Sequence, residues 1–213
     1  MNAFRKITRA KLDAFLARHA TDARTLDIGS GGSSYGRYFP NRVTIDIDPA
    51  RAPDIVGDAH ALPFGDGEFS SVLCTEVLEH LEDPKVAIGE MFRVTAPGGT
   101  LVLTTRFVYP LHDAPRDYWR FTKYGLLKLF EQWTIVELLP ETRSFSTLGV
   151  LMQRIAFQSD LMLGPLAKFA LLSKAVVADH LNFLVRREYG DIRRSVAEHE
   201  LMPSGYHLVC RKP

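Results

Sequence analysis

The sequence lacks several features by which protein classes are recognised. It has 2 cysteines in 213 residues, Cys74 and Cys210, and their separation fits neither a metal-binding pair nor a disulfide framework, so we expect a reducing, cytoplasmic setting. No stretch reaches the roughly 18 uncharged apolar residues that a membrane-spanning helix needs. The net charge is only +1 at pH 7, which gives no electrostatic argument for a nucleic-acid partner.

A hydrophobic content of 46% is enough for one buried core, and we therefore expect a single domain over residues 1–213. Residues 1–20 have the spacing of an amphipathic helix with a basic face, and they lack the continuous apolar core of a secretory signal. Such a segment resembles an organelle transit peptide, but a helix packed over a sheet is the interpretation that we favour.

Short β-branched runs alternate with helical patterns from Thr25 to Thr105, and this order predicts parallel strands joined by helices, the α/β class. Helices are expected at Tyr35–Phe39, Pro84–Arg93 and Lys123–Phe130, the last capped by Thr122. The last two strands are predicted to form an antiparallel edge. The expected strands are Thr25–Ile28, Val43–Ile47, Ile55–Val56, Ser71–Thr75, Thr100–Thr104, Thr134–Leu138 and Gly205–Arg211.

The segment before the last strand differs in composition from the rest of the chain, because Leu, Met, Phe and Ala dominate from Thr147 to Leu184. Gly164-Pro165 divides it, so we predict two apolar helices in an insertion over residues 147–190. A cover for the sheet, a homodimer face, an acceptor-site lid and a peripheral membrane contact all fit this composition.

The segment from Leu26 to Ser34, LDIGSGGSS, joins a buried-strand pattern to a glycine-rich turn, and Asp46 ends the next strand. Bare backbone at such a turn admits a ligand, and a carboxylate at the following strand end binds ribose hydroxyls in α/β sheets. A dinucleotide fingerprint needs glycine at position 34, which is Ser34. Asp27 would repel phosphates and attract a cationic amino-acid group. The turn therefore favours S-adenosylmethionine over NAD.

Five blocks follow one another in order between residues 26 and 105: LDIGSGG, TIDID, GDAHALPF, CTEVLEHL and RVTAPGGTLVLTT. In this order they resemble the class I S-adenosylmethionine-dependent methyltransferases of the methyltransferase type 11 kind. The resemblance implies a Rossmann-like, doubly wound, mostly parallel seven-stranded sheet with an antiparallel edge strand. The core would cover residues 25–138, and residues 205–211 would be the last strand.

The resemblance also assigns cofactor roles to individual residues. Asp46 would bind the ribose diol, Asp58 and Ala59 would hold the adenine, and Ile47 would cover its ring. His80 would be the next inward-facing side chain, and Ser70 departs from the aspartate that the family usually has there. The complete cofactor-binding set is Asp27, Gly29, Gly31, Asp46, Ile47, Asp58, Ala59, Thr75 and Glu76.

Acceptor chemistry is expected in a polar loop after the fifth strand, residues 109–122. His112 is the preferred general base, ahead of Asp113, because histidine titrates near neutral pH. A structural lid is the alternative, in which Asp117 and Arg120 pair and Trp119 packs on the domain. No metal ligands are predicted. The expected acceptor-binding residues are His80, Arg116, Asp117, Tyr118 and Trp119.

The predicted function is methyl transfer from S-adenosylmethionine to a small molecule, a sugar or a lipid-linked glycan. The glycan option is implied by the HD-x-P-x-D-Y-W-R-F-T block, which resembles a methyltransferase subset from cell-surface glycan biosynthesis. A regulatory module that binds the cofactor without transferring methyl groups and an NAD-dependent oxidoreductase are the alternatives.

Overall fold

The computed structural model describes residues 5–29, 31–32, 35–198 and 200–213. Ser34, which the sequence argument used against a dinucleotide, lies outside these ranges. The backbone contacts divide the chain into two compact units. Unit 1 contains residues 1–14, 107–110 and 140–205, and unit 2 contains residues 15–106, 111–139 and 206–213. The predicted single-domain organisation stays a prediction, and the predicted insertion lies within unit 1.

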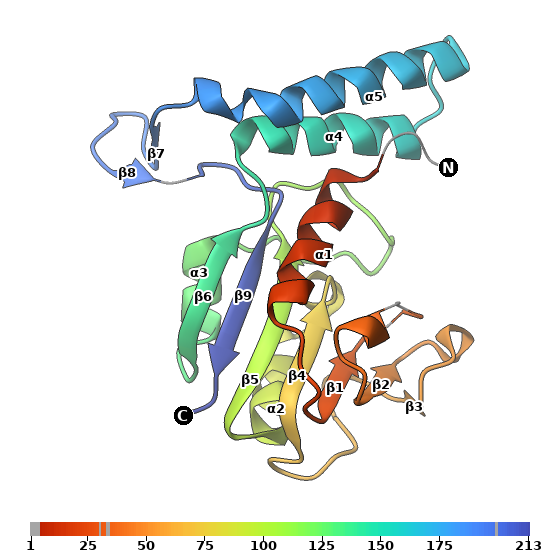
Figure 1. The fold of residues 1–213 in the computed structure, drawn as a ribbon, viewed down its shortest axis with the longest axis vertical. Coiled ribbons are helices and arrows are strands. Elements are labelled where there is room, and N and C mark those ends of the chain that lie inside the picture. Colours follow the sequence, from red (N-terminus) through yellow and green to blue (C-terminus); the bar gives the residue numbers. More distant parts are fainter. Residues whose placement is uncertain (1–4, 30, 33–34, 199) are drawn as a thin grey trace. The chain divides into compact units, whose positions relative to one another are not determined.

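Unit 2 is built on a seven-stranded sheet in the order β3-β2-β1-β4-β5-β9-β6, drawn in Figure 1. Strands β1 to β5 pair in parallel, while β9 runs opposite to β6. The predicted fold class is therefore confirmed, although the antiparallel strand lies inside the sheet and β6 forms its edge. The strands are β1 Thr25–Ile28, β2 Arg42–Asp46, β3 Ile55–Val56, β4 Phe69–Thr75, β5 Thr95–Arg106, β6 Thr134–Pro140 and β9 Gly205–Arg211.

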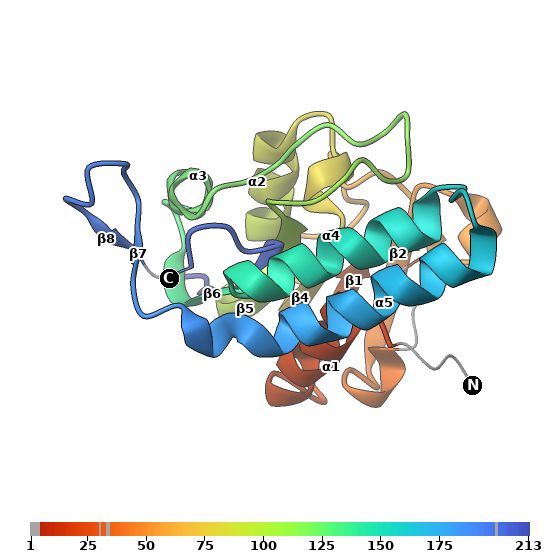
Figure 2. The same ribbon diagram turned by 90° about the horizontal axis from the view of Figure 1, so that it is seen from above.

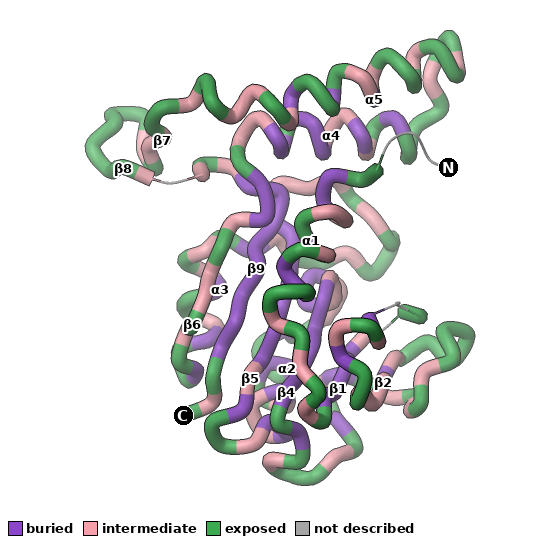
Figure 3. The backbone as a smooth tube through the Cα atoms, viewed as in Figure 1, coloured by how far each residue is buried: buried purple, intermediate pink, exposed green. Residues whose placement is uncertain are grey.

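The inner strands are apolar on both faces because helices cover a parallel sheet from both sides. Every residue of β1 is buried, and β4 has one exposed residue, Ser70. The strands appear as buried segments in Figure 3, and Leu26, Leu73 and Leu101 have 0% exposure. This packing makes the sheet a rigid base for the loops at its carboxyl edge.

The helices of unit 2 begin where capping side chains are available. Asp83 accepts hydrogen bonds from the amides of Lys85 and Val86 at the start of α2, Pro84–Val94. Thr122 caps α3, Lys123–Leu129, as predicted. The helix predicted at Tyr35–Phe39 is only a 3₁₀ turn, η1, Tyr35–Arg37. Two more such turns are η2, Pro49–Arg51, and η3, Leu78–His80. The predicted N-terminal helix is α1, Ile7–Arg18.

Unit 1 contains the two predicted apolar helices, α4 Ser144–Gln158 and α5 Gly164–His180. They lie side by side in Figures 1 and 2. A Cβ on Gly149 would lie 2.7 Å from the carbonyl oxygen of Ala175, so this glycine permits the close approach of the two helices. The remaining elements of the unit are η4 Leu181–Leu184, β7 Glu188–Tyr189 and β8 Ala197–Glu198.

One face of α5 and its flanking residues exposes large apolar side chains. Within α5 itself, Leu166, Phe169, Val176 and Val177 follow one another at gaps of three, seven and one residues, which places them on one face of the helix. In the ranges that the structure describes, no helix is both long and apolar enough to cross a membrane. The exposed side chains are Met162, Leu163, Leu166, Phe169, Val176, Val177, Phe183 and Leu184, and we call them the α5 stripe.

Candidate functional site

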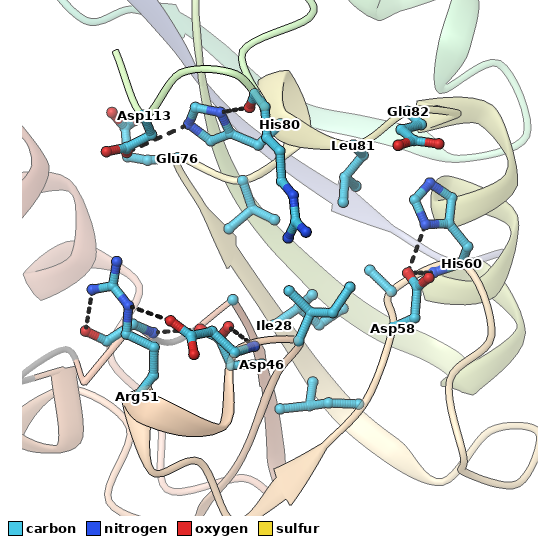
Figure 4. Close-up of a pocket in the computed structure, with 18 of the residues that line it drawn as sticks. Ile28, Asp46, Arg51, Asp58, His60, Glu76, His80, Leu81, Glu82 and Asp113 are labelled. Atoms are coloured by element: carbon cyan, nitrogen blue, oxygen red, sulfur yellow. Dashed lines mark hydrogen bonds and ion pairs between the residues drawn. The ribbon is translucent and has the colours of Figure 1, made fainter.

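A cavity of about 660 Å³ lies at the carboxyl ends of β1 to β4, and Figure 4 shows most of its lining. Its wall includes Gly29 after β1, Asp46 at the end of β2, Asp58 after β3 and Glu76 after β4. Open α/β sheets bind their ligands at this edge, where successive loops diverge. The cavity also has the size of a typical small-molecule site.

The glycine turn forms one side of the cavity. Gly29 has φ of +66°, and a Cβ there would collide with the side chain of Val77. The amide of Gly31 donates to one carboxylate oxygen of Asp46 at 3.0 Å, and the amide of Asp48 donates to the other at 3.0 Å. Both oxygens of Asp46 are thereby fixed at the rim, with further lone pairs for a ligand hydroxyl.

Asp58 and His60 form the opposite side of the cavity. The Asp58 carboxylate accepts the His60 amide at 2.9 Å and lies 2.6 Å from the ring Nδ1 of the same histidine. The backbone hydrogen bond, followed by the ring contact, holds the pKa of Asp58 below its usual value. Ile47 lies on the cavity wall with 54% of its surface exposed, which provides an apolar face for a planar ring.

Glu76 follows β4 with φ of +58°, an unfavourable conformation for a residue with a side chain. Its amide donates to the carbonyl oxygen of Thr104 at 3.0 Å, and its Oε1 accepts from the hydroxyl of the same threonine at 2.8 Å. Oε2 pairs with Arg106, which is buried. The neighbouring strand β5 therefore fixes this carboxylate on the cavity wall.

The polar loop after β5 is attached to η3 and to Leu81, the residue after it, through four contacts that involve backbone groups. The amides of Tyr118 and Trp119 donate to the Glu79 carbonyl oxygen at 3.0 and 3.1 Å. The Trp119 indole donates to Leu81, and the ring Nδ1 of His80 lies 2.5 Å from the carbonyl oxygen of Arg116. His80 and Asp113 lie together at the cavity, with 4.0 Å between the histidine Nε2 and the aspartate Oδ2 (Figure 4).

A second layer of charged side chains lies outside the cavity lining. Glu79 is fully buried, and burial raises the pKa of its carboxyl group. His112 is 3.8 Å from Glu79, and burial lowers the pKa of His112 to about 4. Burial alone would raise the pKa of Asp117, but hydrogen bonds from Arg120 and from the His112 amide lower it to about 2.

Most of the predicted site residues meet at the cavity. Five predicted residues are not part of its lining. Asp27 is buried on β1 and pairs with Arg42 at 2.8 Å, and Thr75 is buried at the end of β4. His112, Asp117 and Trp119 instead hold the loop in place: the His112 amide donates to Asp117, and the Trp119 indole donates to the carbonyl oxygen of Leu81. The predicted residues in the lining are Gly29, Gly31, Asp46, Ile47, Asp58, Ala59, Glu76, His80, Asp113, Arg116 and Tyr118.

Among the lining residues with ionisable side chains, the sequence argument gave no role to Asp48, Arg51, His60 and Glu82. His60 lies within the GDAHALPF block, and its spacing of two residues from Asp58 is the signal that could have identified it. Arg51 reaches the cavity from η2, and nothing in the local sequence pattern distinguishes it from a solvated arginine.

The family described as "Methyltransferase domain" matches residues 26–103, the segment that supplies β1 to β4 and most of the cavity wall. Residues 26–103 form a class I, S-adenosylmethionine-dependent methyltransferase domain. Among curated relatives, the demethylmenaquinone methyltransferase of Renibacterium salmoninarum is 36% identical over 101 residues, covering 41% of this chain and 42% of the relative. The ubiquinone biosynthesis O-methyltransferase of Psychrobacter cryohalolentis is 31% identical over 107 residues, covering 50% and 39%.

The chain thus spans less than half the length of these two relatives. A solved structure of the N-methyltransferase NodS from Bradyrhizobium japonicum, in complex with S-adenosyl-L-homocysteine, matches with a TM-score of 0.53 and 20% identity. That match covers 65% of this chain and 81% of NodS. At this level of identity it shows a shared fold.

The cofactor of this class is S-adenosylmethionine, and the cavity fits it. A ribose diol needs a carboxylate acceptor with free lone pairs, which Asp46 presents at the rim. The adenine amine needs an acceptor beside an apolar wall, which Asp58 and Ile47 provide. The cationic sulfonium and amino groups favour a negative lining, and Glu76 is the carboxylate nearest to the end of β4.

Proposed function

We propose that the chain transfers a methyl group from S-adenosylmethionine to a hydroxyl oxygen of a small acceptor of the quinol kind. The observation that carries this proposal is the pair formed by His80 and Asp113, which adds proton-accepting groups to the cavity wall. A hydroxyl acceptor must lose its proton near the transition state. The named quinone-pathway relatives support a small aromatic acceptor.

Bound S-adenosylmethionine supplies an electrophilic methyl group with a neutral thioether as leaving group. In such a transfer the acceptor oxygen lone pair would form the new carbon–oxygen bond, and the carbon–sulfur bond pair would return to sulfur. The hydroxyl proton leaves toward the His80–Asp113 pair. The loop of residues 111–120 positions the acceptor, because its attachment to η3 holds Arg116 and Tyr118 at the cavity. In-line alignment is the main contribution that the protein makes to such a displacement.

Labelled methyl transfer across a panel of reduced quinols, sugars and amines tests this proposal. Wild-type protein should label quinol hydroxyl groups. Asp113→Asn should lower kcat by about 100-fold or more, because general-base catalysis contributes about that much, and should leave cofactor affinity unchanged. Lys128→Gln on exposed α3 is the matched control. Transfer to sugars alone would favour the glycan alternative, and cofactor binding without any transfer would favour a regulatory module.

We also propose that the α5 stripe contacts a membrane that contains the acceptor. Exposed apolar side chains at helical spacing bury themselves at a lipid interface. Unit 1 has twelve Lys and Arg residues and eight Asp and Glu residues, a net charge of +4, which suits anionic lipid. Lys168 on α5 and Lys6 flank the Phe157 ring of α4, at 5.4 and 5.9 Å from its centroid.

Flotation with anionic and zwitterionic vesicles tests the membrane proposal. The double variant Leu166→Glu/Phe169→Glu should lose binding to anionic vesicles, while Val136→Glu, at an exposed position on β6, should bind as wild type does. If the wild type sediments as a dimer and does not bind vesicles, a second copy of the chain covers the α5 stripe instead.

A further inference from the structure

Three side chains of metal-ligand type converge beside the cavity. Glu79 and His80 are consecutive residues of η3, and His112 comes from the loop after β5. One ligand atom from each residue lies within 4.8 Å of the others. We propose that Glu79, His80 and His112 bind a divalent transition metal of the zinc class, with an open coordination position toward the cavity.

The identity of the three donors favours such a metal. Two imidazoles and one carboxylate form a set that binds zinc at catalytic sites, with a fourth position left for water or substrate. Donors of a tetrahedral site with bonds of about 2.1 Å lie about 3.4 Å apart. The Glu79 Oε1 and His112 Nε2 atoms are 3.8 Å apart and all three donors lie within 4.8 Å of one another, so the donors would move together by at most about 1.4 Å to bind a metal.

Each donor is also oriented by a second contact. The Thr105 hydroxyl donates to Glu79 Oε2 at 2.7 Å, which directs Oε1 toward His112. A proton on Nδ1 of His80 bonds the Arg116 carbonyl oxygen at 2.5 Å, and this tautomer leaves the Nε2 lone pair for a metal. His112 Nδ1 faces the Asp117 carboxylate at 3.4 Å. Contacts of this kind orient metal-ligating side chains in proteins.

The local charge balance points the same way. Glu79 is completely buried, and its Oε1 has no hydrogen-bond partner among the described residues. Arg106 pairs with Glu76, and Arg120 donates to both oxygens of Asp117 at 2.7 Å. A buried carboxylate with one oxygen left without a hydrogen bond is costly. A bound cation would compensate its charge.

The role of this metal rests on the proposed function, although its binding does not. His80 lines the cavity and Glu79 and His112 do not, so a bound ion would meet an acceptor on the His80 side. A divalent ion lowers the pKa of a hydroxyl group that it coordinates. Asp113, 4.0 Å from His80 Nε2, would then receive the proton. Without a metal, His80 itself is available to take it.

Titration of metal-free protein with Zn²⁺ and Co²⁺ tests the site directly. Calorimetry should show one Zn²⁺ per chain, and bound Co²⁺ should give the intense visible bands of a tetrahedral ion. Glu79→Gln and His112→Ala should each weaken Zn²⁺ binding by at least about tenfold, the smallest loss typical even of outer-shell changes. His60→Ala, which removes a cavity histidine outside the cluster, should bind Zn²⁺ as wild type does.

Circular dichroism and calorimetry with S-adenosyl-L-homocysteine establish that each variant is folded. If the cluster variants do not fold, an anomalous-difference map of Zn²⁺-soaked wild-type crystals decides, with a peak between the three side chains as the expected result. Equal Zn²⁺ affinity of wild type and His112→Ala, or a map without that peak, would overturn the proposal. If the protein binds S-adenosyl-L-homocysteine but no metal, only the metal proposal is refuted. If it binds neither S-adenosyl-L-homocysteine nor metal, the assignment of the cofactor site is refuted as well.

Discussion

Replacement of Asp46 by alanine should remove most of the cofactor affinity. The carboxylate holds the amides of Gly31 and Asp48, each at 3.0 Å, and faces the position expected for the ribose diol. A hydrogen bond to a charged group contributes about 1.5–3 kcal/mol. The loss of two ribose contacts therefore costs at least about 3 kcal/mol, which corresponds to a more than 100-fold increase in Kd.

Calorimetry with S-adenosyl-L-homocysteine measures this loss, and Asp54→Ala provides the matched control. Asp54 lies in the same part of the chain and accepts two hydrogen bonds from Thr44, at 2.8 and 2.7 Å, but it does not line the cavity. We expect the control variant to retain wild-type affinity. The reasoning would be refuted if folded Asp46→Ala bound the ligand within about threefold of wild type, a difference of less than about 0.7 kcal/mol.

Three further predictions concern other parts of unit 2. Gly29→Ala should abolish cofactor binding, because a φ of +66° and the side chain of Val77 both exclude a Cβ at this position. Calorimetry with S-adenosyl-L-homocysteine measures this, and wild-type affinity in the folded variant would contradict it. Burial raises the pKa of the Cys74 and Cys210 thiols, so neither should react with iodoacetamide at pH 8 until the protein is unfolded, as mass spectrometry would show. Burial alone would raise the pKa of Glu137, but its partners Arg18 and His19 hold that pKa below the usual value. Glu137→Gln should therefore lower the free energy of unfolding by up to about 1 kcal/mol near pH 7. This difference between the variant and the wild type should disappear as the pH falls below about 4, where the carboxylate is protonated. A deficit that persists at pH 3 in urea titrations would contradict the last assignment.

The strands and the glycine turn were predictable because their causes are local. Thr25–Ile28 has the predicted bounds, and β-branched and apolar residues favour a strand whether or not its neighbours are known. The turn at Gly29 follows from a backbone conformation that only glycine adopts easily. The predicted S-adenosylmethionine cofactor is confirmed by the family match of residues 26–103.

The sequence does not predict which side chains of the polar loop line the cavity and which do not. His112 and Asp113 are adjacent in sequence, yet Asp113 lines the cavity and His112 does not. The difference arises from long-range contacts, because the Tyr118 and Trp119 amides attach the loop to Glu79, some 40 residues earlier in the chain. Asp27 shows the same limitation, since its partner is Arg42 on the neighbouring strand. The preference for His112 as general base stays a prediction.

A crystal structure with S-adenosyl-L-homocysteine and a reduced quinol bound would test the central claim most directly. The account predicts the ribose at Asp46, the adenine between Ile47 and Asp58, and an acceptor hydroxyl oxygen beside His80 and Asp113. That oxygen should lie in line with the sulfur, at the spacing that leaves room for a methyl group between them. An acceptor that presents a ring carbon to the sulfur, with its hydroxyl groups directed away from His80 and Asp113, would contradict the account.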